Sequence, residues 1–453
     1  MKVAIAGYGA EGQANYNYWR TQTDDITICD ENTPSRTIPE DAKTIFGEDA
    51  FSQLQDFDLV VRTAGLRPDK IKTNGKIWSA TNEFFNQCPV PIIGVTGTKG
   101  KGTTATLVSK ILEEAGRKVW LLGNIGVPAL EVLEEIQNYS GSDGVVVFEL
   151  SSFQLWDLEK SPQTAVVLMI EPDHMDVHAS MEEYVAAKAN ITAFQSEEDF
   201  LVYHPTNTYS QQIAEQSKAL KARFMTEEGA NVVIPAKAGI QKSETVDPSF
   251  RWDDEVERIV IQEQLICAVE EVGLRGRHNL ENICAAITAS WNFTKDTSAI
   301  KEAVTQFKGL PHRLELVREF DGALYYNDSY SSAPGATIAA IKSFTNPEIL
   351  ICGGFDRGLD YTELAESVAE RENIKQVFLI GETKERIAET FRSANFTNFE
   401  VVGSTNFSDI VAHARENAKA GDVVVLSPGC ASFDMFKNFQ DRGEQFRKIV
   451  EEF

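Results

Sequence analysis

A glycine-rich loop in the first quarter of the chain restricts the possible folds more than any other feature. The loop reads GVTGTKGKGTT at residues 94–104 and follows an apolar run at 91–95. A helical segment begins at Thr103 and runs to Gly116, a residue type that commonly ends a helix. Backbone N–H groups in such a loop, with the N-terminus of the following helix, hold phosphate groups. A strand, a phosphate loop and a helix in this order predict a parallel α/β sheet that binds a nucleotide.

The loop offers the groups that would hold ATP. Its glycines allow the tight turn, and Lys101 stands where a cation reaches the outer phosphates. Gly102 follows, at a position where such loops normally place a Ser or Thr whose hydroxyl binds Mg²⁺. Thr103 and Thr104 can offer that hydroxyl one residue later, and we expect Thr103 to do so. The candidate ATP-binding residues of the loop are Gly97, Thr98, Lys99, Gly100, Lys101, Gly102, Thr103 and Thr104.

Short β-branched runs alternate with helical segments along the whole chain, as in parallel sheets with crossover helices. At 453 residues the chain is long enough for about three domains. The polar stretch at 225–254 is expected to be a surface excursion. We therefore predict a three-domain α/β fold with a Rossmann-like domain at 1–80, a central domain with a P-loop ATPase-type parallel sheet at 81–309, and a C-terminal Rossmann-like domain at 310–453.

Charge and composition exclude several kinds of partner and location. The net charge is −25 and the pI is about 4.7, which argues against nucleic acid or an anionic membrane as the main partner. No apolar run reaches the ~18 residues of a membrane span, and the N-terminus lacks the pattern of a signal peptide. The six cysteines are scattered without zinc-site spacing, which is typical of reduced thiols. We expect a cytoplasmic protein that acts as a monomer.

A second glycine turn, GYGAEG, occupies residues 7–12 after the strand-like run KVAIA. This spacing occurs in dinucleotide-binding domains, so a nicotinamide-dependent dehydrogenase is one interpretation, although the motif is weak on its own. Asp30 ends the next strand-like run, and Thr63-Ala64-Gly65 follows a later one. These residues are positional candidates for a second ligand.

Further motifs follow the phosphate loop in a fixed order. They are GNIG at 123–126, ELSSFQL at 149–155, EPDHMDVH at 171–178, YVAAKANI at 184–191, GRHNLEN at 276–282, GLPHRLE at 309–315 and LSPGCASFDMFKNFQDRGEQF at 426–446. With the two glycine loops, this set resembles the Mur ligase family over essentially the whole chain. The resemblance implies an amide ligase in which ATP phosphorylates a substrate carboxylate and an amino group then attacks the acyl phosphate. Catalysis of this kind depends mostly on positioning and on cations.

The resemblance also implies a substrate. It is closest to the ligases that join glutamate to UDP-N-acetylmuramoyl-L-alanine in cytoplasmic peptidoglycan precursor synthesis, a pathway tied to cell wall biogenesis, cell shape and cell division. D-glutamate is the expected acceptor, with an L-glutamate-adding ligase as the alternative. A folylpolyglutamate synthase-like ligase is more distant, because that family begins near the phosphate loop. A nucleotide-binding partner without turnover is a further alternative.

By the same resemblance, two Mg²⁺ ions lie beside the ATP phosphates. Glu149 ends the run VVVF and is an implied ligand, as is His174 after the run AVVLMI. Lys188 is implied to react with CO₂, which turns a cation into a carbamate anion near the metal. The implied metal site is Thr103, Glu149, His174 and Lys188 as carbamate. The implied catalytic residues are Lys101, Asn124, Glu149, His174 and Lys188.

Other implied contacts come from all three domains. Asn279 and Asn282 share a helix face beside the nucleotide, while Arg313 and Asp328 would reach ATP from the third domain, which implies domain closure. The first domain would take the uridine diphosphate, where the family usually has Ser-Pro-Gly in place of Thr63-Ala64-Gly65. The implied UDP-sugar residues are Gly9, Ala10, Glu11, Asp30, Glu31, Thr63, Gly65, Asn124, Ser151, Ser152 and Gln154.

The implied glutamate pocket departs from the family pattern. Tyr330 stands in NDSYSSAP where many members have a lysine, and Arg357 lies near a second family lysine. Those lysines hold the carboxylates of glutamate. Arg357 can replace one of them and bind in a bidentate manner, whereas Tyr330 offers only a neutral hydroxyl. The implied glutamate site is Tyr330, Ser331, Ser332, Arg357, Ser432, Phe433 and Phe439.

Overall fold

The computed structural model describes residues 1–34, 36–124, 128–175, 177–226, 229–233, 258–262, 264–274 and 277–453. Most of the excursion predicted at 225–254 lies outside these residues, as do Gly126, Asp176 and Gly276 of the motifs. The chain forms two compact units, 1–307 and 308–453. Across the described residues, no helix has both the length and the apolar character needed to cross a bilayer.

The first sheet is built from five parallel strands in the order β3-β2-β1-β4-β5. Apolar residues on both faces pack into two small cores, as expected for a parallel sheet. Helix α1 (Ala10–Trp19) follows the first glycine turn at the carboxyl end of β1. The strands are β1 (Val3–Ala6), β2 (Ile26–Asp30), β3 (Lys43–Phe46), β4 (Leu59–Arg62) and β5 (Lys76–Ser79).

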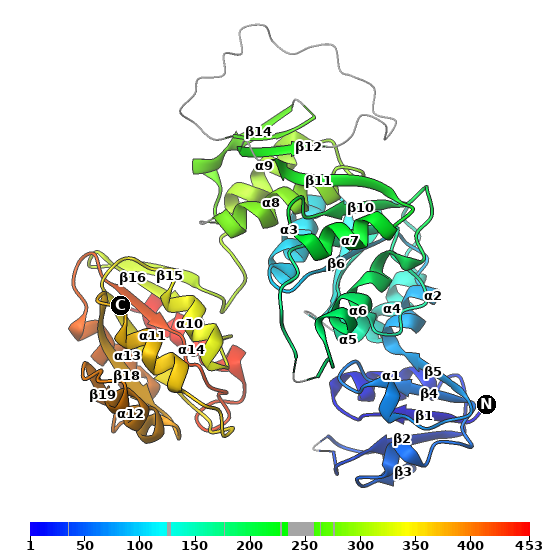
Figure 1. The fold of residues 1–453 in the computed structure, drawn as a ribbon, viewed down its shortest axis with the longest axis horizontal. Coiled ribbons are helices and arrows are strands. Elements are labelled where there is room, and N and C mark those ends of the chain that lie inside the picture. Colours follow the sequence, from blue (N-terminus) through cyan, green and yellow to red (C-terminus); the bar gives the residue numbers. More distant parts are fainter. Residues whose placement is uncertain are drawn as a thin grey trace, which may run out of the picture. The chain divides into compact units, whose positions relative to one another are not determined.

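The second sheet has nine strands in the order β14-β13-β12-β11-β10-β9-β6-β8-β7, and the six strands β6 to β11 are mutually parallel (Figure 1). These strands are β6 (Ile92–Thr96), β7 (Lys118–Gly123), β8 (Gly144–Glu149), β9 (Thr164–Val167), β10 (Phe200–Tyr203), β11 (Leu220–Thr226), β12 (Gly229–Val233), β13 (Arg258–Ile261) and β14 (Gln264–Ala268). The accompanying helices are α2 (Ala80–Gln87), α3 (Lys101–Glu114), α4 (Ala129–Gln137), α5 (Ser152–Leu155), α6 (Met181–Ala193), α7 (Thr208–Gln216), α8 (Arg277–Ser290) and α9 (Thr297–Gln306).

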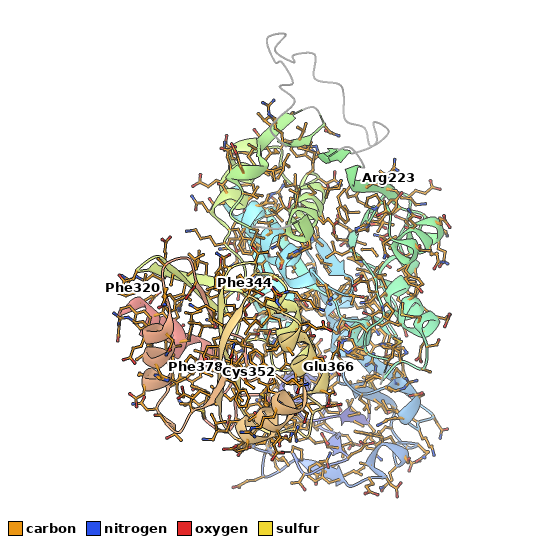
Figure 2. All side chains as sticks on the ribbon, turned by 60° about the vertical axis from the view of Figure 1, so that its left-hand side comes forward. Arg223, Phe320, Phe344, Cys352, Glu366 and Phe378 are labelled. Carbon is orange, nitrogen blue, oxygen red and sulfur yellow. The ribbon has the colours of Figure 1, made fainter. Side chains whose placement is uncertain are left out.

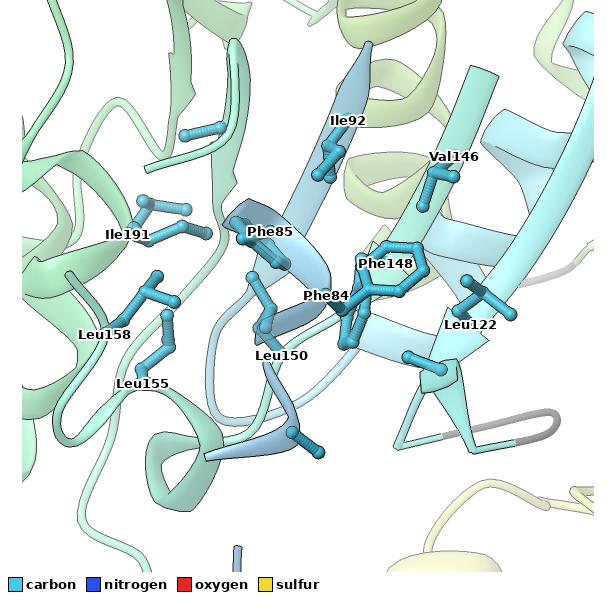
Figure 3. Packing of buried hydrophobic residues seen from close by; sticks show 14 of the residues in the cluster. Phe84, Phe85, Ile92, Leu122, Val146, Phe148, Leu150, Leu155, Leu158 and Ile191 are labelled. Carbon is cyan, nitrogen blue, oxygen red and sulfur yellow. The ribbon is translucent and has the colours of Figure 1, made fainter. Parts of the chain in front are cut away.

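Helix α2 joins the two sheets of the first unit without a linker. Ser79 ends β5 and caps α2, because its hydroxyl accepts from the Asn82 backbone N–H at 3.1 Å. Phe84 and Phe85 of α2 are fully buried and lie beside Phe148 of β8 (Figure 3). Burial of each phenylalanine contributes roughly 1.5–3 kcal/mol. Helix α2 therefore belongs to the core of the central sheet, and the predicted division between residues 80 and 81 falls in its first turn.

The second unit contains a six-stranded sheet in the order β15-β16-β20-β17-β18-β19, with β15 antiparallel and the rest parallel. Its two faces carry separate cores. Cys352 belongs to one core and Phe378 to the other, and both are labelled in Figure 2. The elements are β15 (Glu315–Phe320), β16 (Ala323–Asn327), α10 (Pro334–Ile341), β17 (Glu348–Gly353), α11 (Thr362–Ala369), β18 (Ile374–Ile380), α12 (Lys384–Ser393), β19 (Phe399–Val401), α13 (Phe407–Asn417), β20 (Val423–Leu426) and α14 (Phe439–Glu451).

Three largely parallel sheets with crossover helices confirm the predicted α/β class. The six cysteines are free, and all but Cys88 are buried, so the expectation of reduced thiols agrees with the structure.

Candidate nucleotide and substrate sites

The phosphate loop lies between β6 and α3, at the carboxyl edge of the central sheet. Gly97 and Gly100 have φ values of 150° and 82°, which glycine adopts without strain. The ammonium of Lys101 donates to the carbonyl oxygens of Gly97 and Thr98 at 3.1 and 2.8 Å. It therefore lies over the loop, where it and the backbone N–H groups at the start of α3 can hold a phosphate group.

Helix α8 contacts the loop through two asparagines. Asn282 Oδ1 accepts from Thr104 Oγ1 at 3.3 Å, and Asn282 Nδ2 donates to Asn279 Oδ1 at 3.3 Å. Thr104 is fully buried, so this contact occupies its hydroxyl. Thr103 is partly exposed in the first turn of α3. Of the two predicted hydroxyls, the one of Thr103 is therefore the better placed to reach a metal ion.

Replacing Gly100 by alanine is expected to weaken ATP binding at least about tenfold, because the residue's φ of 82° disfavours any side chain. A Cβ there would also lie 2.2 Å from Asn282 Oδ1. Gly116→Ala is the matched control: Gly116 has a φ of 79°, but its Cβ would meet nothing within 4 Å. Calorimetric titration with ATP measures both variants. Equal affinity in Gly100→Ala and the wild type would contradict the role given to this turn.

Thr98 fixes the loop from the other side. Its Oγ1 lies 3.1 Å from the Tyr184 hydroxyl, accepts from Glu171 N at 2.9 Å and lies 3.0 Å from Glu171 O. Lys99 beside it is exposed, and Gly102 is buried under the first turn of α3. Tyr184, the first residue of the motif at 184–191, is thus a structural support of the phosphate loop.

Glu149 and Asn124 meet where β8 and β7 end. Glu149 is 2% exposed, and its Oε1 accepts from Asn124 Nδ2 at 3.0 Å. The Asn124 backbone N–H also donates to Glu149 O at 3.0 Å. Glu149 Oε2 is buried without a hydrogen-bond partner. A buried carboxylate oxygen in this state needs a cation or a donor from outside the chain.

Lys188 on α6 points at the phosphate loop. Its Nζ donates to Gly97 O at 2.9 Å and to Thr96 Oγ1 at 3.4 Å, so Lys188 and Lys101 share one carbonyl acceptor. The side chain is almost fully buried. Burial first, and then the cation of Lys101, hold the pKa of Lys188 well below its ordinary value. The structure therefore brings Lys101, Glu149 and Lys188 together, and the burial of Lys188 favours its neutral amine.

His174 lies apart from this group in the described structure. It adopts a positive φ of 54°, its side chain is 46% exposed, and its ring packs 5.0 Å from that of Phe153. Within the described ranges, no contact joins it to Glu149 or Lys188, and no three His, Cys, Asp or Glu side chains converge as a metal-binding group. The predicted metal set of Thr103, Glu149, His174 and Lys188 therefore stays a prediction.

The residues present nevertheless fit a magnesium ion. Glu149 offers an unpartnered carboxylate oxygen, and a carbamate on Lys188 would add two more oxygens beside the phosphate loop. Oxygen ligands of this kind, with substrate phosphates, are what Mg²⁺ prefers.

A cavity of about 360 Å³ lies between the first sheet and the central sheet. On the side of the first sheet, Ala10 and Glu11 line the cavity from the start of α1, and Gly65 lines it from the loop after β4. On the side of the central sheet, it is lined by Ser151 and Gln154, which form the capping box of α5. Six predicted UDP-sugar residues line this cavity: Ala10, Glu11, Gly65, Asn124, Ser151 and Gln154.

The other predicted UDP-sugar residues do not line the cavity, and most of them make hydrogen bonds or ion pairs near it. Asp30 accepts from the Tyr8 backbone N–H at 2.7 Å, and Thr63 Oγ1 donates to Ala6 O at 3.3 Å. Ser152 is buried, with its hydroxyl 3.0 Å from His178 Nε2. Gly9 caps α1, and Glu31 lies 3.8 Å from Lys70. These residues border the turns that form the cavity.

Asn15 is a cavity residue that the sequence analysis missed. It is fully buried, and neither atom of its side-chain amide has a hydrogen-bond partner. It lines the same cavity one helical turn after Glu11. A ligand or ordered water that pairs with this amide would remove the cost of its burial. The sequence signal was a polar Asn one helical turn after Glu11 in the first helix.

In the second unit, Tyr330 supports Arg313. The Arg313 guanidinium lies 3.7 Å above the Tyr330 ring, whose edge packs on Phe439. Asp328 accepts from Leu314 N at 3.1 Å, from Ser331 Oγ at 2.5 Å and from a third donor, Ser427 Oγ, at 2.7 Å. Burial raises the pKa of Asp328 to about 6. Asp328 thus joins the motifs at 309–315 and 327–334 into one structure.

Arg357 and Phe433 form a neighbouring group. The Arg357 guanidinium lies 5.7 Å from the Phe433 ring, and Phe433 is 57% exposed. Ser432 is buried, and Ser332 is partly buried, with its hydroxyl donating to Tyr330 O at 3.2 Å. Among the described residues, no ring contact joins this pair to Tyr330 and Phe439, so the single glutamate site stays a prediction.

Two family models match the chain. The Mur ligase middle domain matches residues 95–290, and the glutamate ligase domain of Mur ligases matches 312–430. A UDP-N-acetylmuramoylalanine--D-glutamate ligase of Acetivibrio thermocellus is 39% identical, covering 99% of this chain and 96% of the relative. A ligase of the same name from Clostridium tetani is 36% identical with the same coverage.

Solved structures show the same fold at lower identity. A UDP-N-acetylmuramate-alanine ligase, MurC, of Thermotoga maritima has a TM-score of 0.57 at 16% identity and covers 100% of this chain and 99% of its own. A MurF ligase of Thermotoga maritima, solved in complex with ADP, has a TM-score of 0.55 at 19% identity, with coverages of 99% and 95%.

Proposed function

This chain belongs to the Mur ligase family, and we propose that it joins D-glutamate to UDP-N-acetylmuramoyl-L-alanine with ATP as the energy source. One observation carries this proposal: the chain aligns over 99% of its length, at 39% identity, with a ligase of that name. The product would be an amide, and the reaction would be a step of cytoplasmic peptidoglycan precursor synthesis.

The phosphate loop gives the ATP step its positioning groups. Lys101 and the N-terminus of α3 would hold the outer phosphates, and Thr103 would present its hydroxyl beside them. Asn279 and Asn282 border the loop from α8. When bound, Mg²⁺ would neutralise charge on the transferring phosphoryl group, held through Glu149, His174 and a modified Lys188.

Lys188 is the proposed site of carbamate formation. A neutral amine attacks the carbon of CO₂, a C–N bond forms, and the amine loses a proton to give the anionic carbamate. The buried position of Lys188 and its neighbour Lys101 favour the neutral amine that this reaction needs. The carbamate would also place an anion beside the cation of Lys101, which removes the repulsion between the two lysines.

The cavity lined by Glu11, Asn124, Ser151 and Gln154 is the proposed position of the UDP-sugar. Asn15 would pair its buried amide with a polar group of the same ligand. Asn124 contacts Glu149 as well, so it connects the substrate cavity to the ATP side.

Phosphate release from ATP tests the proposal directly. The reaction is run with UDP-N-acetylmuramoyl-L-alanine and either D-glutamate or L-glutamate, and each substrate is omitted in turn. We expect Mg²⁺-dependent release only when the UDP-sugar and D-glutamate are both present. Release with the UDP-sugar and L-glutamate, but not with the UDP-sugar and D-glutamate, would assign the chain to the L-glutamate-adding alternative. Tyr330 and Arg357, where the resemblance implies lysines, are the reason to test this alternative. Release with neither would contradict the proposed substrates.

A further inference from the structure

We propose that Arg62 fixes the two sides of the substrate cavity relative to each other and is a positioning residue for UDP-sugar binding. The inference rests on the proposed function, because it takes the UDP-sugar as the ligand of the cavity. Arg62 lies outside the family motifs, and its buried guanidinium makes hydrogen bonds to both sides of the cavity.

One edge of the Arg62 guanidinium binds the central domain. Arg62 ends β4, and its side chain has no exposed surface. Its Nε and Nη2 donate to the two carboxylate oxygens of Asp157 at 2.7 and 2.5 Å. Nη2 also donates to Phe153 O at 2.9 Å. Phe153 lies in α5 and lines the cavity, and Asp157 follows two residues after the end of this helix.

The other nitrogen of the guanidinium binds the loop after β4. Nη1 lies within hydrogen-bond distance of the carbonyl oxygens of Thr63, Ala64 and Leu66, at 3.3, 3.1 and 3.1 Å. Ala64 lines the cavity from the first sheet, and Phe153 lines it from the central sheet. A single planar group therefore connects backbone atoms from both sides, and a change in its position would change the distance between them.

A second side chain, Glu11, also holds the loop after β4, in which residue 64 is alanine. Proline would have restricted the backbone and would have no N–H group. Here the Ala64 N–H donates to Glu11 Oε2 at 2.9 Å, a contact that proline cannot make. Burial raises the pKa of Glu11, and the charge of Arg62 opposes that rise. Two side chains, Arg62 and Glu11, thus hold the backbone of the loop.

Two other ion pairs also connect the first sheet to the central domain, but their side chains are more exposed than that of Arg62. Lys76 pairs with Glu159 at 2.8 Å, but both side chains are about half exposed and neither lines the cavity. Arg67 pairs with Glu183 at 3.0 Å and would remain when Arg62 is changed. Exposed pairs contribute little, whereas loss of one member of a buried pair leaves an uncompensated charge.

Binding of UDP-N-acetylmuramoyl-L-alanine, measured by calorimetry, tests the inference. We expect Arg62→Met and Arg62→Lys to weaken it by about 10- to 100-fold, since neither side chain can make the bidentate contact. Their KM for this substrate should rise in parallel, while the KM for ATP changes by less than about threefold. Lys76→Met removes a cation from the same interface and should bind like the wild type. Arg442→Met removes an equally buried arginine in 308–453 and should also leave this affinity unchanged.

Hydrogen exchange supplies a readout that needs no ligand. In Arg62→Met, peptides covering 63–66 and 151–157 should both exchange faster than in the wild type, because their shared contact is gone. If Arg62→Met does not fold, Asp157→Asn replaces it, with an expected loss of affinity of about tenfold. Wild-type affinity and unchanged exchange in a folded variant would overturn the inference. If the wild type itself does not bind the UDP-sugar, the proposed function fails, and the exchange result still decides whether Arg62 joins the two segments.

Discussion

Replacing Lys101 by methionine is expected to slow phosphate release from ATP by a factor of about 1,000 or more. Lys101 is the cation that lies over the phosphate loop, with its ammonium 2.8 Å from Thr98 O. Phosphoryl transfer spreads negative charge over the transferred group, and methionine keeps the length of the side chain without its charge. The loss should therefore appear in kcat rather than in the stability of the fold.

Lys110→Met is the control for this prediction. Lys110 lies on the same helix, α3, and pairs with Glu113 at 3.5 Å on an exposed surface. Its loss changes the net charge by the same amount, so an unspecific charge effect would appear in both variants. Stopped-time assays of phosphate release, with thermal unfolding as a check on folding, compare the two. A Lys101→Met variant with more than about a tenth of the wild-type kcat would exclude Lys101 as the main phosphate-binding cation.

The fold and the phosphate loop could be predicted from local sequence because their determinants are local. Glycines at 97 and 100 are needed for the positive φ values that the turn adopts. The apolar run at 91–95 predicts a strand before the loop, and the structure has the buried strand β6 at Ile92–Thr96. The Glu149 position at a strand end follows from the same pattern. Each of these features depends on residues close together in the chain.

What the sequence did not reveal depends on distant partners. Thr104 looks like Thr103 in sequence, but its hydroxyl is occupied by Asn282, which lies 178 positions later. Arg62 follows an ordinary strand pattern, and only Asp157 and Phe153 give it a role. Asn15 became a candidate only because the structure buries its amide beside a cavity. No periodicity or motif encodes such pairings, since they arise from the way the sheets pack.

The division of the chain into compact units also depends on contacts between residues that are distant in the sequence. The phosphate loop needs a strand and a helix of its own, which predicted a break near residue 80. In the structure α2 follows β5 directly and enters the central core, and the compact units divide between 307 and 308. Three sheets therefore do not require three separate compact units.

Glu348→Gln is expected to stabilise the unit 308–453 by roughly 3 to 5 kcal/mol at pH 8.5 and by almost nothing near pH 4.5. Glu348 begins β17, is fully buried, and has no hydrogen-bond partner for either carboxylate oxygen. Burial raises its pKa from 4.5 to about 8, although the nearby Arg371 opposes the rise. Between these two values the folded protein keeps a proton that the unfolded chain has released.

Stability should therefore fall as the pH rises from 4.5 to 8, by up to about 1.4 kcal/mol per pH unit, and stay level above that range. Glutamine cannot ionise, so the variant lacks this loss. Hydrogen exchange of the β17 amides reports on this unit, and tryptophan fluorescence reports on the other, because all six tryptophans lie within 1–307. Glu366→Gln changes an exposed carboxylate of the same unit, labelled in Figure 2, and should give no difference at any pH. A Glu348→Gln effect that is equal at pH 5 and pH 8.5 would show that Glu348 is ionised in the folded protein throughout, with a partner that offsets its burial.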